Sequence, residues 1–308
     1  MSPGILFTFV VAYFVILLVV AWYTGRNSNN DTFFIGNRNS NWMLVAFGMI
    51  GTSLSGVTFV SVPGAVGREA FSYMQITLGY FLGYITIAYV LIPLYYRLKL
   101  TSIYNYLNSR FVRSSYKTGA SFFILSRTLG ATARLYLVVR ILQDAILSSF
   151  GIPFWLTTLI ILFMILLYTY EGGVKTIVYT DTLQTTCMLA GLVICVGFIL
   201  HNMHLSLGES ITAMNERGLT KIFNTDPDSK LFFVKQILAG AFITITMTGL
   251  DQEMMQKNIS VKTLKDSKKN MVSLALIMVI VIGLFLYLGG LLHLYGAHQQ
   301  VAAEGDRL

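Results

Sequence analysis

Residues 42–66 read Trp-Met-Leu-Val-Ala-Phe-Gly-Met-Ile-Gly-Thr-Ser-Leu-Ser-Gly-Val-Thr-Phe-Val-Ser-Val-Pro-Gly-Ala-Val, an uncharged run long enough to cross a bilayer as a helix. Its middle disfavours a continuous helix, because Gly48, Gly51 and Gly56 lower helix propensity and Pro63 removes a backbone hydrogen bond. The same turns also carry five hydroxyls, from Thr52, Ser53, Ser55, Thr58 and Ser61. An interrupted span is tolerated only where it is buried in protein or lines a wet cavity. The run therefore indicates either a substrate or ion site or a place where small residues let helices pack closely.

Composition places this run in a membrane protein. Of 308 residues, 55% are hydrophobic and 12% are charged, and the mean hydropathy is +0.67. A soluble domain carries about 25% charged residues. We therefore predict an all-α integral membrane protein in contact with the lipid bilayer.

Eight apolar segments are long enough, or nearly so, to be transmembrane helices. They are Ile5–Tyr23, Trp42–Val66, Ala70–Tyr96, Gly119–Phe150, Pro153–Tyr170, Thr182–Leu200, Leu231–Leu250 and Met271–Tyr295.

The positive charges lie mostly in one set of connecting loops. With the N-terminus outside, the loops at 24–41, 97–118, 171–181 and 251–270 are cytoplasmic and hold thirteen Lys and Arg, against five outside. This bias agrees with the positive-inside rule and attributes the net charge of +8 to topology. The sequence predicts a multi-pass protein of the cytoplasmic (plasma) membrane, and nucleic-acid binding is not expected.

The fourth segment is unusual because it contains four charged residues. Arg140 and Asp144 lie one helical turn apart and are predicted to pair. Arg127 and Arg134 share a deeper face, where they could neutralise an anionic substrate or bind internal carbonyls. Arg127 could also extend its guanidinium toward the cytoplasmic surface.

Residues 168–184 contain a second group of polar residues. Gly172-Gly173 predicts a turn, and Thr180-Asp181 is predicted to cap the following helix, with Gln184 in its first turn. Capping is sufficient to explain Asp181. An acidic group at a helix mouth could alternatively meet a cation on its way to the cytoplasm.

The seventh segment repeats the composition of the second. Gly240 and Gly249 bracket Thr244, Thr246 and Thr248. Two glycine-interrupted, hydroxyl-rich spans in corresponding positions indicate a secondary transporter built from inverted repeats, although threonines also join helices in membranes. No phosphate-binding loop or paired His/Cys metal spacing occurs, so an enzyme is not expected.

Four motifs resemble the sodium/solute symporter family, and together they run over nearly the whole chain. They are Asp31-Thr-Phe-Phe-Ile-Gly-Asn-Arg38, Ser53-Leu-Ser-Gly-Val-Thr-Phe59 with Pro63-Gly64, Gly172-Gly173 through Thr180-Asp181-Thr-Leu-Gln184, and Gly249-Leu-Asp-Gln-Glu-Met-Met-Gln-Lys257. Thr101-Ser-Ile-Tyr-Asn-Tyr-Leu-Asn-Ser-Arg-Phe111 is also similar to a cytoplasmic segment of that family.

The resemblance implies an inverted-repeat fold of five plus five helices with one extra N-terminal helix, about eight transmembrane helices being present here. Residues 1–41 would form the extra helix and a cytoplasmic loop, 42–201 the first repeat, and 202–308 the start of the second. The chain ends before the core helix that supplies sodium-binding hydroxyls, so we expect a C-terminally truncated sequence.

The resemblance also implies a site. Sodium, the coupling ion, would bind the carbonyls of Gly51 and Leu54, with Asp181 near the sodium path. Substrate contacts are expected at Ser53, Ser55, Thr58, Gln75, Arg127 or Arg134, and Thr244 or Met247. Sugar-carrying relatives have a tyrosine where this chain has Met247, which disfavours a hexose.

The expected function is sodium-coupled symport of a small polar, possibly anionic, organic solute by alternating access. The alternatives are a non-transporting membrane sensor and an inactive truncated fragment. A channel is disfavoured, because broken helices indicate an occluded site.

Overall fold

The structure, a computed structural model, describes residues 3–25, 40–98, 102–169 and 173–298. Within these ranges the chain is helical, and the described residues form no β-strand beyond two isolated bridges, Ser40 with Val261 and Asn224 with Phe232. The prediction of an all-α protein is confirmed. The motif at residues 31–38 lies outside the described residues.

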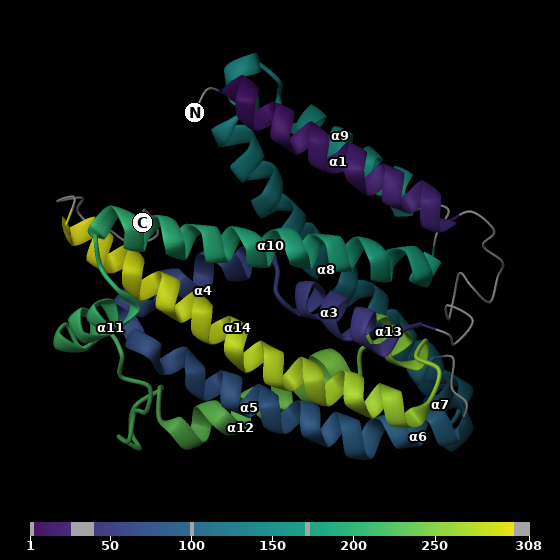
Figure 1. Ribbon diagram of the computed structural model, residues 1–308. Helices are drawn as coiled ribbons and strands as arrows, with labels where there is room; N and C mark the ends of the chain where they lie inside the picture. The colour runs from purple at the N-terminus through teal and green to yellow at the C-terminus, as the bar shows by residue number, and fades with distance from the viewer. Residues whose placement is uncertain (1–2, 26–39, 99–101, 170–172, 299–308) are drawn as a thin grey trace.

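The helices follow one another with short connections (Figure 1). The α-helices are α1 (Pro3–Gly25), α3 (Trp42–Ser53), α4 (Gly56–Glu69), α5 (Tyr73–Thr86), α6 (Ile92–Arg97), α7 (Ile103–Arg110), α8 (Arg113–Ala145), α9 (Phe154–Thr169), α10 (Gly173–Met203), α11 (Leu207–Glu216), α12 (Phe233–Thr244), α13 (Gln252–Ile259) and α14 (Leu264–His298). Short 3-10 turns cover Ala70–Ser72 and Leu147–Phe150, and π-helical turns cover Ile87–Leu91 and Ile245–Gly249.

Every apolar segment identified in the sequence is helical, but not every one is a full span. Five helices are long and apolar enough to cross a membrane, or six when the bent pair formed by 233–249 and 252–259 counts as one span. The helices Trp42–Ser53 and Phe154–Leu167 are apolar but shorter. The count of eight spans and the division into two repeats therefore remain predictions.

The second apolar segment is broken where its composition disfavours a helix. Helix α3 ends at Ser53, Leu54 is extended at φ −100° and ψ 120°, Ser55 is extended at φ −105° and ψ 172°, and α4 begins at Gly56. Pro63 lies inside α4 and does not cause the break. The predicted interruption is confirmed, and it falls among the hydroxyl residues.

A second broken helix lies further along the chain. Helix α12 continues through the π-helical turn to Gly249, and α13 then leaves at 69°. The connecting loop predicted at 251–270 contains α13, whose residues Met254, Lys257 and Asn258 are buried in the protein, so this part is not a solvated loop, and its cytoplasmic placement stays a prediction.

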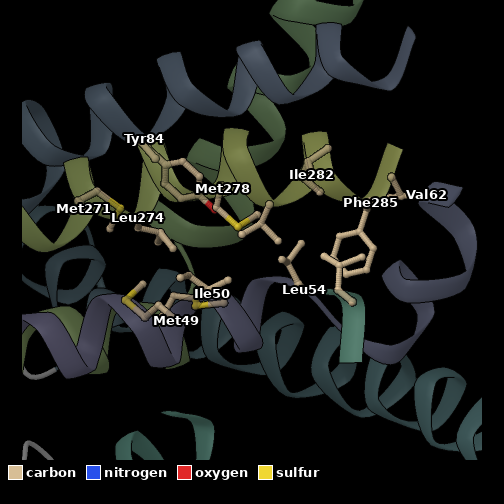
Figure 2. Close-up of a cluster of buried hydrophobic side chains, with 14 of the residues drawn as sticks. Met49, Ile50, Leu54, Val62, Tyr84, Met271, Leu274, Met278, Ile282 and Phe285 are labelled. Atoms are coloured by element: carbon tan, nitrogen blue, oxygen red, sulfur yellow. The ribbon is translucent and has the colours of Figure 1, made fainter. Parts of the chain in front are cut away.

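Helix α14 forms the centre of the helical core. It packs against α3, α4, α5 and α10, while α1 and α9 lie side by side at one edge (Figure 1). Its apolar face contributes Met271, Leu274, Met278, Ile282 and Phe285, all nearly inaccessible to solvent. These side chains meet Met49, Ile50 and Leu54, so the first break is held directly against the core (Figure 2).

Helices α5 and α12 cross at glycines. A methyl group at Gly79 would strike the backbone of α12, and one at Gly240 would strike the backbone of α5 at Ile76. Such close approach requires the smallest residue. Gly240, part of the pattern that suggested a repeat, is therefore explained by packing.

Candidate functional site

A cavity of about 360 Å³ opens at the first break. Its lining includes eight of the residues named from the sequence: Ser53, Leu54, Ser55, Thr58, Arg127, Arg134, Thr244 and Met247. The opposite wall adds three tyrosines that sequence reasoning missed, Tyr73, Tyr80 and Tyr84. The broken helix, α5, α8 and α12 thus bring hydroxyls, phenols and two guanidinium groups to one chamber.

The break leaves backbone acceptors without helical partners. The Leu54 N–H donates to the Ile50 carbonyl at 2.7 Å, and the Ser55 N–H donates to the Thr58 hydroxyl at 3.2 Å. Among the described residues, no hydrogen bond reaches the carbonyl oxygens of Gly51 or Leu54. A helix end leaves such carbonyls available to a side chain, water or ligand.

Ser53 adds a further unsatisfied oxygen. Its Oγ is buried beside the Tyr84 phenol, with which it makes no hydrogen bond of full geometry, and it has no other partner in the described part of the chain. Buried polar atoms are normally paired, so an orphaned hydroxyl beside a cavity suits a bound ligand.

A second cavity, of about 490 Å³, lies on the α10 side of the same break. Gly51, Leu54, Asp181 and Gln184 line it, and Arg134 reaches both cavities. A methyl group at Gly51 would collide with the Thr185 hydroxyl, so Gly51 also provides the close contact between α3 and α10. Packing therefore explains Gly51, and its role in an ion site stays a prediction.

Asp181 is not a helix cap. Helix α10 begins at Gly173, so Asp181 lies two turns inside it, and the predicted capping role is wrong. Its Oδ2 instead accepts hydrogen bonds from Lys257 Nζ at 2.7 Å and from the Thr52 hydroxyl at 3.0 Å. The cluster joins α3, α10 and α13.

Lys257 is the residue that sequence reasoning missed most clearly. Only 4% of it is exposed, and its ammonium also donates to the Thr52 hydroxyl at 2.8 Å and lies 3.4 Å from Glu253 Oε1. We had counted it among the cytoplasmic loop charges. The one available signal was its position at the end of the motif 249–257, which says nothing about burial.

Arg127 has an internal partner. It forms an ion pair with Asp251, which also caps α13 by accepting the Met254 N–H at 3.1 Å. The nearby Tyr104 on α7 has a raised pKa, first because it is partly buried and second because of the Asp251 charge, with Arg127 acting in the opposite direction. None of the alternatives given for Arg127 included this ion pair with Asp251, and the guanidinium also lines the cavity.

Arg134 and the outer pair behave differently. Arg134 is exposed to the cavities and forms no ion pair with any described residue. Arg140 and Asp144 pair at 3.7 Å, as predicted, on an exposed surface.

Gln75 lies outside the cavity. It is fully buried, its amide donates to the carbonyls of Ser72 and Leu231, and its oxygen accepts the Asn224 N–H. These contacts hold the segment before α12 in place. They account for Gln75 without a ligand, and the structure offers no support for a substrate contact there.

The comparisons with known proteins agree with this architecture. The model of the sodium:solute symporter family matches residues 33–307, and the chain belongs to that family. It is 28% identical to the sodium/iodide cotransporter of Homo sapiens over 79% of this chain and 37% of that protein. It is 24% identical to the sodium/sialic acid symporter SiaT of Proteus mirabilis, over 95% of this chain and 58% of the relative.

A solved structure has the same fold. A Na+-coupled sialic acid symporter in a substrate-bound outward-open state superimposes with a TM-score of 0.84 at 22% identity, covering 97% of this chain and 63% of that one. The chain thus spans less than two thirds of the length of these relatives. Family and helices together define an integral, multi-pass membrane protein.

Proposed function

We propose that this protein mediates Na+-coupled symport of a small, polar, anionic organic solute by alternating access. The observation that carries the proposal is the break at Leu54 and Ser55, where the Leu54 carbonyl accepts no hydrogen bond from a described residue and hydroxyl side chains line a cavity of about 360 Å³. Broken spans whose freed backbone faces a mid-membrane cavity are the usual ion and substrate sites of secondary transporters.

Sodium is the proposed coupling ion. It is a hard cation that prefers oxygen ligands, and the free carbonyls of Gly51 and Leu54 supply two. Asp181 provides the nearby negative charge on the cytoplasmic path, facing the second cavity with Gly51 and Leu54. The names of the relatives, which are sodium-coupled transporters, support this choice.

The solute would occupy the larger set of polar groups. The hydroxyls of Ser53, Ser55 and Thr58 would bind its polar groups, and Thr244 and Met247 would close the chamber from the side of α12. Arg134 is the guanidinium available to a carboxylate, because the charge of Arg127 is already balanced by Asp251. Arg127 then acts as a positioning residue that holds the second broken helix.

The transport cycle follows from differential binding. An ion shifts the equilibrium between outward-open and inward-open states only by its difference in affinity for the two. Sodium at the α3 break would bridge carbonyls that are free in the open state, and the solute would complete closure. Residues 42–201 and the segment beginning at 202 would be the inverted repeats that move relative to each other.

Transport assays with the complete coding sequence test the proposal. Cells expressing it are given labelled sugar acids, monocarboxylates, amino acids and neutral sugars, with and without an inward sodium gradient. We expect sodium-dependent accumulation of an anionic solute, with KM raised at least tenfold by Arg134→Gln and much less by Arg134→Lys. Arg140→Gln serves as the matched control, since Arg140 lies in an exposed pair on the same helix.

Two results would contradict the proposal. Uptake at the same rate with and without a sodium gradient would contradict sodium coupling. Accumulation of neutral solutes only, at a rate that Arg134→Gln does not change, would contradict an anionic substrate.

A further inference from the structure

One lysine lies between two carboxylates that face different cavities. Lys257 Nζ lies 2.7 Å from Asp181 Oδ2 and 3.4 Å from Glu253 Oε1. Asp181 lines the second cavity, beside the free carbonyls of Gly51 and Leu54. Glu253 lines the solute cavity together with Arg127 and Arg134.

The two carboxylates differ in their need for the ammonium. The side chain of Asp181 is 16% exposed, whereas that of Glu253 is 47% exposed and can be hydrated. A buried charge requires a partner more strongly than a solvated one. The ammonium therefore lies closer to Asp181, and Glu253 is its nearest alternative, one turn away on α13.

Any cation that binds Asp181 from the second cavity must share that carboxylate with this ammonium. Two unit positive charges at one carboxylate oxygen repel each other, and in a site largely shielded from water the repulsion is weakly screened. The Thr52 hydroxyl, within 2.8 Å of Lys257 and 3.0 Å of Asp181, belongs to the last turn of α3 and is adjacent to Gly51. Cation binding and the position of the ammonium are thus mutually exclusive or nearly so.

We propose that Lys257 is a tethered competitor of the transported cation for Asp181, and that its transfer to Glu253 signals ion occupancy to the solute cavity. This inference rests on the proposed function. With the cation absent, Lys257 binds Asp181 most closely and pairs with Glu253 only at 3.4 Å, so Glu253 keeps part of its negative charge beside Arg127 and Arg134. With the cation bound, Lys257 neutralises Glu253, and the solute cavity becomes more favourable to an anion.

The device links the two sites in both directions. An ion that strengthens anion binding must itself be bound more tightly when the anion is present, by the same factor. No large movement of α13 is required, because the two acceptors lie on either side of one flexible side chain. Coupling would thus be achieved by moving one positive charge between two fixed negative ones.

Binding of ²²Na+ to the purified complete transporter in nanodiscs tests the inference with four proteins: wild type, Lys257→Gln, Glu253→Gln and the double variant. Lys257→Gln removes the competitor, so the Kd for Na+ is expected to fall about fivefold or more, within the usual range of coupling between ligands. Glu253→Gln removes the alternative acceptor, so the Kd is expected to rise by a similar factor. Lys257→Arg, which keeps a tethered cation, should stay within about twofold of wild type.

The double variant separates competition from a general effect of charge. If Glu253 acted on Na+ only through its field, Glu253→Gln would weaken binding equally in both backgrounds. If Lys257 competes with Na+, Glu253→Gln has no effect on the Kd for Na+ once Lys257 is replaced. The double variant should therefore bind Na+ with the same Kd as Lys257→Gln.

Several outcomes would overturn the inference. It fails if folded Lys257→Gln binds Na+ as weakly as wild type or more weakly, or if the two effects add. If Lys257→Gln does not fold, Glu253→Gln still tests the inference, because the Glu253 side chain is half exposed. An unchanged Na+ affinity in Glu253→Gln would reject the inference. If the wild-type protein binds no Na+, the proposed function is rejected as well. If uptake is driven by sodium but Lys257→Gln binds Na+ with the same Kd as wild type, only the role of Lys257 as a competitor is rejected.

Discussion

The two broken helices of this protein are built from different chemistry. The break between α3 and α4 is neutral, with an extended Leu54 and Ser55 and carbonyls that no described residue satisfies. The break before α13 is charged, since Asp251 caps the helix and pairs with Arg127. Lys257, in the last turn of α13, forms an ion pair with Asp181.

This difference in chemistry determines whether each break can bind a ligand. Internal ion pairs satisfy the second break, so it needs no ligand and acts as an anchor between α8, α10 and α12. The first break keeps unsatisfied oxygen atoms, and an ion or solute can complete it. A binding site arises where the protein leaves a polar group unpaired, rather than where it places the most charge.

The largest effect is expected at the charged break. Asp251→Ala removes both the cap of α13 and the partner of Arg127, and should lower the free energy of unfolding by about 2–3 kcal/mol. Asp251→Asn keeps a capping side chain and should cost about half as much. Thermal unfolding of the purified variants measures both. Equal stability of Asp251→Ala and wild type would show that the pair does not anchor this break.

A smaller loss is expected where the neutral break packs. Gly51→Ala places a methyl group against the Thr185 hydroxyl and should cost about 1–2 kcal/mol. The added substitution Thr185→Ala should recover most of that loss, because it removes the colliding atom. Gly191→Ala, on a part of α10 where a methyl group would meet nothing within 4 Å, is the matched control. Additive losses in the double variant would mean that Gly51 acts through backbone flexibility instead.

The Thr58 hydroxyl should contribute about 1 kcal/mol to stability, the usual value of one hydrogen bond. Thr58→Val removes the acceptor of the Ser55 N–H at the neutral break. We also expect slower sodium-dependent uptake. Thr86→Val is the control, because the exposed Thr86 hydroxyl only donates to its own helix at Leu82. If the two valine variants melt alike and transport alike, this hydrogen bond does not shape the break.

The smallest effect is expected at the exposed ion pair. Asp144→Asn separates Arg140 from its partner at a solvated surface, where such pairs contribute little. The free energy of unfolding should change by less than about 0.5 kcal/mol. A loss as large as that of Asp251→Ala would contradict the view that burial and capping, rather than charge, give the second break its strength.

The sequence alone was sufficient for much that depends on neighbouring residues, although the capping role predicted for Asp181 was wrong. Helices in hydrocarbon satisfy their own backbone, so composition and length identify them one by one. The glycines of residues 42–66 likewise predicted an interruption in the middle of that span, which the structure places at Leu54 and Ser55, and the spacing of Arg140 and Asp144 predicted their pairing. Eight of the 21 residues that line the cavity were also predicted for the site, because they cluster around that interruption or follow from the family resemblance.

Only the tertiary structure decided which buried charges are paired. Lys257 is 76 residues from Asp181 in the sequence and 205 from Thr52, and α13 was indistinguishable from a basic loop. Gln75 is conspicuous as a polar residue in an apolar segment, yet two of its partners, the Leu231 carbonyl and the Asn224 N–H, belong to a distant part of the chain. Backbone hydrogen bonds in a helix are local and can be read along the chain, whereas the partner of a buried charge depends on which helices pack together.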